Sequence, residues 1–150
     1  MDAIDRKIVA QLQANGRLTM SDVAARVRLS VSSCHRRLRT LEREGVILGY
    51  RAQVDPSAVG LEFEALVFVT MQTAQRGPVA AFETAVADLP NVISAQRLFG
   101  DPDYLLRVVA RDLTAFQEIY DGHLAALPGV EKLRSTLVMK SVVDDRGVPL

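Results

Sequence analysis

The chain has 150 residues, of which 49% are apolar and 24% charged, as in a soluble protein of one medium-sized domain or two small ones. Its formal net charge is zero, and its single cysteine, Cys34, excludes an internal disulfide. No apolar run approaches the roughly 20 residues of a membrane-spanning helix and the acidic start lacks a signal-peptide pattern, so we expect a cytoplasmic location.

Three helices are expected in the first 44 residues. Asp2 caps the first helix, and Thr19 begins the second, with Asp22 as the other half of a capping box. After a tight turn, Ser30 caps a third helix that runs to about Glu44. A helix, a short helix, a tight turn and a longer helix are typical of the helix-turn-helix, whose later helix enters the DNA major groove.

The third helix is expected to have two different faces. Cys34, Leu38 and Leu41 fall on one side and should pack against the first two helices. The other positions carry small hydroxyls, which permit close approach, and arginines, which bind guanine edges or phosphates. The candidate DNA-binding residues of this helix are Ser32, Ser33, His35, Arg36, Arg37, Arg39, Thr40 and Arg43.

Charge distribution supports a DNA partner. Ten of the 18 basic residues, but only five of the 18 acidic residues, lie in the first 51 positions. Such a basic module is suited to a polyanion. A solvated basic helix and chance clustering of charge are the alternatives.

Residues 46–54 predict a wing of two short strands, because branched and aromatic residues flank Gly49 there. Arg51 in this wing is a further candidate phosphate contact. Asp55-Pro56-Ser57 predicts a turn and a domain boundary. We therefore expect a winged helix-turn-helix in residues 1–55, a linker in residues 56–62 and a second domain in residues 63–150.

The last ninety residues contain a repeat. Leu89-Pro90-Asn91-Val92 and Leu127-Pro128-Gly129-Val130 each follow an amphipathic helical segment, the second of which is expected to begin at Thr114, and each precedes a strand-like segment. The expected strands are 64–73, 92–99, 104–111 and 130–142. Two successive strand-helix-strand units predict a ferredoxin-like βαββαβ domain with both helices on one face of the sheet, and hence an α+β protein.

The other face of that sheet is expected to be apolar. Residues 65–69 are continuously apolar and residues 104–109 nearly so, whereas a strand with one exposed face should alternate. A monomer would then expose a large apolar patch. We infer a symmetric homodimer formed through these faces; a single covering strand or the wing from the same chain is the alternative.

Several motifs resemble those of the Lrp/AsnC, or feast/famine, transcriptional regulators of bacteria and archaea. In the second domain, Gly100–Leu106 resembles a turn of that family's RAM domain (regulation of amino acid metabolism). The resemblance covers about residues 4–142, in the family's domain order. In the first domain it rests on Leu29-Ser30, Arg37, Leu38, Leu41-Glu42, Gly45-Val46-Ile47, Gly49-Tyr50 and Asp55-Pro56, followed by Gly60.

The resemblance implies a sequence-specific regulator of amino-acid-related metabolism whose dimers assemble into octamers. An amino acid effector would bind between RAM domains, where carboxylates suit its ammonium group and hydroxyls or backbone N–H groups suit its carboxylate. The chain departs from the family pattern at Pro102 and Leu133. The effector-binding positions that the resemblance implies are Gly100, Asp101, Asp103, Leu105, Ser135 and Thr136.

Two other functions compete with this interpretation. An architectural DNA-binding protein would have no effector, and the turn at residues 100–103 would then only connect strands. An enzyme is not expected, because the sequence has no Gly-rich phosphate loop and no nucleophile with an adjacent base. His35 and His123 are the only histidines and lie far apart, so no metal and no cofactor are expected either.

Overall fold

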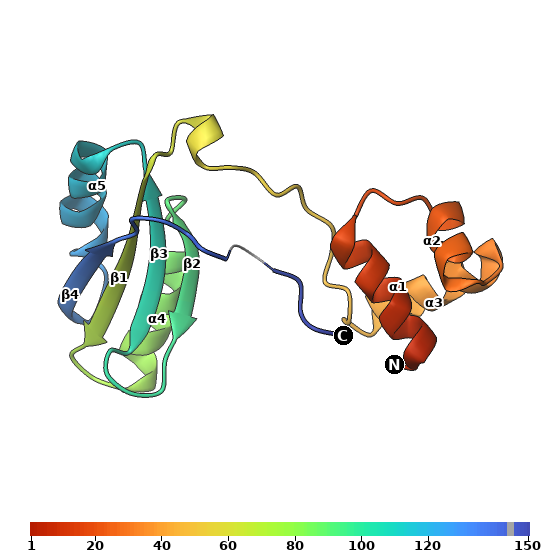
Figure 1. Ribbon diagram of the computed structural model, residues 1–150. Coiled ribbons are helices and arrows are strands. Elements are labelled where there is room, and N and C mark those ends of the chain that lie inside the picture. Colours follow the sequence, from red (N-terminus) through yellow and green to blue (C-terminus); the bar gives the residue numbers. More distant parts are fainter. Residues whose placement is uncertain (144–145) are drawn as a thin grey trace. The chain divides into compact units, whose positions relative to one another are not determined.

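The computed structural model describes residues 1–143 and 146–150, and the chain divides into two compact units (Figure 1). The first unit contains Met1–Gln53 together with Val143–Leu150, and the second contains Val54–Val142. Residues 144 and 145, which belong to the expected second domain, lie outside the described residues. No helix in the described part of the chain is both long and apolar enough to cross a membrane.

The first unit has the three helices that the sequence predicts, each with its expected N-terminal cap. Asp2 accepts hydrogen bonds from the backbone N–H groups of Ile4 and Asp5, and Thr19 and Asp22 form a complete capping box. Ser30 accepts a hydrogen bond from the backbone of the residue three positions later. The helices are α1 (Ala3–Ala14), α2 (Met20–Val27) and α3 (Val31–Arg43).

The inner faces of these helices form one small core. Ile8, Val23 and Cys34 have no exposed surface and come from α1, α2 and α3 in turn. Burial raises the pKa of the Cys34 thiol, which suits a packing role better than a reactive one. Arg28 links α2 to α3 in the left-handed backbone region (φ 58°) and makes the turn tight. The core thereby presents the opposite face of α3 to solvent.

The prediction that residues 46–54 form a wing of two short strands is wrong. Residues 46–54, all of which the structure describes, form an irregular segment without strand pairing that begins with a bend at residues 46–47. The backbone N–H groups of Val46 and Ile47 bond back to the Leu41 carbonyl, so only seven residues of the segment remain for a hairpin. A two-stranded hairpin alone is marginally stable in water, and Leu48 and Tyr50 are exposed rather than packed on a core.

The second unit is a four-stranded antiparallel sheet with the strand order β2-β3-β1-β4, which confirms the ferredoxin-like prediction. A short 3-10 turn, Ser57–Val59, precedes the sheet. The strands are β1 (Phe63–Met71), β2 (Val92–Arg97), β3 (Tyr104–Ala110) and β4 (Val130–Leu137), and the helices are α4 (Arg76–Ala87) and α5 (Leu113–Ile119), which continues into a π-helical turn, Tyr120–Leu124.

One helix begins earlier than predicted. Asp112, rather than Thr114, is the N-cap of α5, and its carboxylate accepts the backbone N–H of Ala115 at 2.7 Å. Aspartate is among the most favourable N-cap residues, so the cap forms at the first suitable position after β3. The helix therefore begins two residues earlier than predicted, and in the π-helical turn that follows it Leu124 is buried while His123 is exposed.

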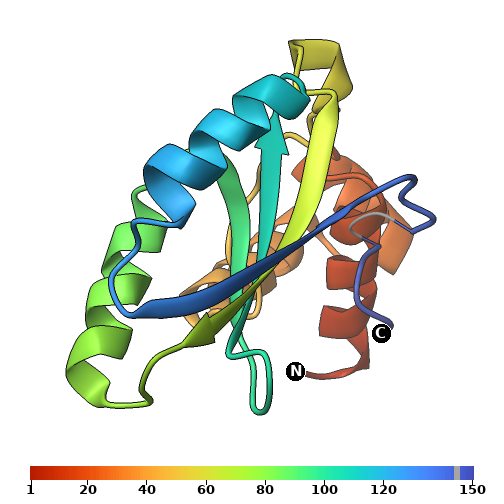
Figure 2. The ribbon, with the colours of Figure 1, turned by 90° about the vertical axis from the view of Figure 1, so that its left-hand side faces the viewer.

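Both helices lie on the same side of the sheet (Figure 2). The core between them is formed by alternate residues of the two central strands, among which Val67, Leu106 and Val108 have no exposed surface. Phe82 of α4 and Phe116 of α5 close this core from the helix side. This burial fixes the direction in which the remaining strand residues point.

The uncovered side of the sheet, which we call the open face, combines apolar and charged side chains. Leu66, Phe68 and Leu105 alternate with core residues and are partly exposed there. Glu64 and Arg107 also lie on this face and form a two-pronged ion pair at 2.7 and 3.0 Å. The open face is therefore less uniformly apolar than the apolar runs at residues 65–69 and 104–109 suggest.

Candidate DNA-binding surface and effector pocket

The outer face of α3 carries most of the candidate DNA-binding residues. Ser32, His35, Arg36, Arg39 and Arg43 are all exposed. This exposure follows from burial of the other side of the same helix in the three-helix core. The structure therefore brings these five side chains onto one solvent-facing surface.

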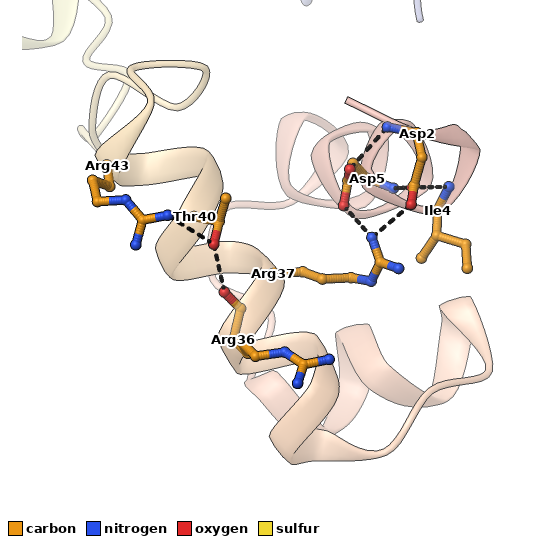
Figure 3. A network of polar contacts seen from close by, with 7 residues as sticks. All are labelled: Asp2, Ile4, Asp5, Arg36, Arg37, Thr40 and Arg43. Atoms are coloured by element: carbon orange, nitrogen blue, oxygen red, sulfur yellow. Dashed lines mark hydrogen bonds and ion pairs between the residues drawn. The ribbon is translucent and has the colours of Figure 1, made fainter.

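Two of these arginines are available for a partner. Among the residues that the structure describes, neither Arg36 nor Arg39 makes an ion pair. Arg43 only reaches the hydroxyl of Thr40, at 3.4 Å, and this hydroxyl donates to the Arg36 carbonyl at 3.2 Å (Figure 3). Ser33, the remaining small candidate, accepts a hydrogen bond from the Ser30 hydroxyl at 2.9 Å.

Arg37 is placed differently from its neighbours. Its guanidinium reaches across to the start of α1, where one nitrogen (Nη1) lies 2.7 Å from Oδ2 of Asp2 and 2.8 Å from Oδ1 of Asp5 (Figure 3). The hydrogen bonds that Arg37 donates to the two carboxylates raise its pKa, the one to Asp5 most strongly. The expected DNA contact thus already has partners inside the protein.

Arg51, the last DNA-binding candidate, lies in the irregular segment that follows α3. Its side chain is exposed, and it takes part in an interaction of its own. Nearby, the hydroxyl of Tyr50 donates to the carboxylate of Glu42 at 3.1 Å. Although the residue as a whole is exposed, the pKa of Tyr50 is raised to about 12, first by partial desolvation of the hydroxyl and then by this contact. This contact joins the irregular segment to the last turn of α3.

The turn between β2 and β3 holds three of the predicted effector residues. Asp103 ties this turn to β1, because its Oδ2 accepts the N–H of Met71 at 2.7 Å and its own N–H donates to the Val69 carbonyl at 2.9 Å. Gly100 has φ +139°, a conformation that side chains rarely adopt. Asp101 is exposed at the tip. The turn is thus anchored to β1 through Asp103, and the exposed Asp101 carboxylate is open to solvent.

A hollow of about 240 Å³, which we call the turn pocket, lies on the open face beside this turn. Phe68 and Thr70 of β1 stand directly opposite Arg134 and Lys132 of β4 in the strand register. Cations, carboxylates and an aromatic ring therefore surround one space. The residues that line it are Phe68, Thr70, Asp101, Pro102, Glu131, Lys132 and Arg134.

The structure does not gather all six predicted effector residues at this pocket. Of the six, only Asp101 lines it, while Leu105 stands beside Phe68 on the open face. Thr136 pairs with Leu66 and also faces that side, whereas Ser135 pairs with the core residue Val67. Ser135 therefore points to the opposite face, where it lines a separate hollow against α5.

The strand register explains why Lys132, Arg134 and Phe68 were missed. Alternation alone shows that Lys132 and Arg134 share a face, but not which residues of β1 stand opposite them. That pairing joins positions more than sixty residues apart in the chain. No local signal in the sequence specifies it.

In the described residues no group of histidine, cysteine, aspartate or glutamate side chains could hold a metal ion.

Known proteins resemble this chain in both units. The model of the Lrp/AsnC ligand binding domain matches residues 64–148, and a winged helix-turn-helix DNA-binding model matches residues 1–47. The chain is 37% identical to the Bkd operon transcriptional regulator of Pseudomonas aeruginosa, over 100% of this chain and 98% of that protein. It is 38% identical to the leucine-responsive regulatory protein of Rhizobium meliloti, over 96% and 92% of the two chains.

Solved structures show the same similarity. A transcriptional regulator from Neisseria meningitidis in complex with L-Met superposes with a TM-score of 0.93 at 34% identity, over 99% of this chain and 96% of that one. A feast or famine regulatory protein from M. tuberculosis complexed with L-methionine superposes with a TM-score of 0.89 at 31% identity, over 98% and 97% of the two chains.

Proposed function

The chain belongs to the Lrp/AsnC family of DNA-binding transcriptional regulators, and we propose that it reads its operator with the outer face of α3 and responds to an amino acid. The observation that supports DNA reading most directly is the exposed pair Arg36 and Arg39, which make no ion pair within the described residues. Exposed arginines without an ion-pair partner in the protein are suited to guanine edges and phosphates.

The proposed DNA contacts exclude one residue of α3. Ser32, His35, Arg36, Arg39 and Arg43 form the contact surface. Ser33 and Thr40 lie at its sides, and Arg51 is the proposed phosphate contact in the irregular segment after α3. Arg37 has no place in this surface because Asp2 and Asp5 bind its guanidinium.

We place the amino acid in the turn pocket. Lys132 and Arg134 provide positive charge for its carboxylate, while Asp101 and Glu131 provide negative charge for its ammonium group. The ring of Phe68 offers an apolar surface for the side chain. The complexes of two relatives with L-methionine support an effector of this class.

We further propose a homodimer in which two open faces meet, with octamers as the higher assembly. Leu66, Phe68 and Leu105 supply the apolar part of this interface. The turn pocket would then lie next to the interface, so effector binding could favour one assembly over another. Such a population shift would alter the spacing of paired α3 helices and hence the affinity for DNA.

One experiment tests both parts of the proposal. A DNA duplex is first selected by the protein from a random-sequence pool, and its affinity is then measured at fixed salt with and without each of the twenty amino acids. We expect at least a tenfold preference for the selected over random duplex and a change in affinity with at least one amino acid. Preference without any amino acid effect would keep sequence-specific reading and refute the effector, whereas absence of preference would refute sequence-specific reading and favour an architectural protein.

A further inference from the structure

We propose that Arg37 is a positioning residue: its ion pairs with Asp2 and Asp5 hold α3 at the angle that DNA reading requires, and it does not itself contact DNA. This inference rests on the proposed role of α3. It deepens that role by assigning a different task to one arginine of the recognition helix. The evidence is the way in which the three charged side chains are joined (Figure 3).

The network uses every carboxylate oxygen of the two aspartates. Oδ1 of Asp2 accepts the backbone N–H groups of Ile4 and Asp5, each at 2.8 Å, and Oδ2 accepts Nη1 of Arg37. Oδ2 of Asp5 accepts the N–H of Asp2 at 2.9 Å, and Oδ1 accepts the same Nη1 of Arg37. The cap of α1 and the clamp on α3 are therefore one closed network.

Burial distinguishes this arrangement from an ordinary surface ion pair. The side chain of Asp5 is only 14% exposed and that of Arg37 only 30%, so the Arg37–Asp5 bridge is partly shielded from water, whereas the side chain of Asp2 is 53% exposed. Partly buried charges gain more from pairing and are screened less by salt than exposed ones. The guanidinium would have to lose two carboxylates before it could reach a phosphate.

The position of Arg37 in α3 explains what the clamp controls. It precedes the buried Leu38 and follows the exposed Arg36, so it stands at the edge between the core face and the DNA-reading face. The core packs α3 through apolar contacts, which resist sliding and rotation less specifically than directed ion pairs. A clamp to the start of α1 sets the rotation of α3 about its axis and thereby the direction of Arg36 and Arg39.

The test uses variants that remove charge but keep the helix cap. Asp5→Asn and Asp2→Asn retain a side-chain oxygen for the backbone N–H groups of the cap, and asparagine is a favourable N-cap residue. These two variants are compared with Arg37→Ala and with the double variant that combines Asp5→Asn and Arg37→Ala. Glu44→Gln, which changes the same net charge at an exposed carboxylate outside the network, is the matched control. Affinities for the selected and for random duplex are measured over a series of salt concentrations.

We expect Arg37→Ala and Asp5→Asn each to weaken binding of the selected duplex by about three- to tenfold, the size that follows from losing one or two partly exposed ion pairs. Random duplex should be affected less, and the dependence of affinity on salt should keep its slope. The double variant should be no worse than Arg37→Ala, because both changes break the same network. Thermal unfolding of each variant shows that it is folded at the temperature of the assay.

Three results would overturn the inference. A salt slope that falls by about one in Arg37→Ala would identify Arg37 as a phosphate contact. Binding that tightens in Asp5→Asn more than in Glu44→Gln would mean that the aspartate competes with DNA for Arg37. Equal losses on selected and random duplex, or no loss, would leave the clamp without a role in reading. If the wild-type protein itself prefers no selected duplex, it is the proposed function that fails.

Discussion

The guanidinium of Arg134 lies over the ring of Phe68, with its central carbon 4.9 Å from the ring centroid. The two residues stand directly opposite each other in the β1–β4 register, so they form one wall of the turn pocket. The contact holds a cation at the pocket while leaving its N–H groups available for a carboxylate. This geometry makes Arg134 the most informative residue for testing the effector site.

Arg134→Ala should weaken binding of the effector by about tenfold or more, because a hydrogen bond to a charged group contributes about 1.5–3 kcal/mol. The effector is the amino acid that raises the melting temperature of the wild-type protein most, and its affinity is measured by calorimetry. Lys140→Ala is the matched control, since it removes a positive charge after the end of β4 and outside the pocket. Unchanged affinity in Arg134→Ala would place the effector elsewhere.

Arg36→Ala should weaken binding of the selected duplex by roughly 1–3 kcal/mol and relax the base preference at one position. The reason is that Arg36 is exposed on the reading face and makes no ion pair in the described part of the chain. Competition binding with duplexes substituted at each position measures both effects. Arg111→Ala, in the other unit, serves as the control for charge. If Arg36→Ala binds every duplex as the wild type does, α3 does not read bases through this residue.

Asp103 and Asp101 lie two positions apart, but their substitution should affect different properties: Asp103 the stability of the fold and Asp101 the binding of the effector. Asp103→Ala leaves the N–H of Met71 without its acceptor and should lower the free energy of unfolding by about 1–3 kcal/mol. Asp101→Ala removes an exposed carboxylate and should change that free energy by about 0.5 kcal/mol or less while weakening effector binding. Denaturant unfolding and calorimetry on both variants test this division. Equal stability of the two variants would contradict it.

Local signals explain which features could be predicted. The caps at Asp2, Thr19 and Ser30 each depend on residues within three positions, and the apolar pattern of the second unit shows the order of its strands and helices along the chain. Long-range contacts explain the failures. The partners of Arg37 lie more than thirty residues earlier in the chain, and the face on which Ser135 lies depends on its register with β1.

The prediction of two strands in the wing failed for a different reason. The pattern of residues 46–54 is typical of strands, but strand formation also needs a hydrogen-bonding partner and a core to cover. The single chain provides neither for Leu48 and Tyr50, which are exposed. Strand propensity alone therefore did not predict the structure of this segment.

Stability should fall at alkaline pH because of Tyr104. Burial in the core, followed by the hydrogen bond from its hydroxyl to Glu83 at 2.8 Å, raises the pKa of Tyr104 to about 12 from the usual value of 10.0. The folded state thus keeps this proton more tightly than the unfolded state. The stabilisation is fully present below pH 10 and is lost as the pH rises toward 12.

Tyr104→Phe isolates this contribution. The variant keeps the ring that packs 4.5 Å from Phe82, centroid to centroid, but has no proton to lose and no bond to Glu83. We expect it to be less stable than the wild type at pH 7, by about 0.5–1.5 kcal/mol, and to lose stability less steeply between pH 10 and pH 12. Denaturant unfolding at several pH values measures both. The pKa of Tyr50 is raised as well, so part of the alkaline loss should remain in the variant. An unchanged slope would mean that Tyr104 ionises alike in the folded and unfolded states.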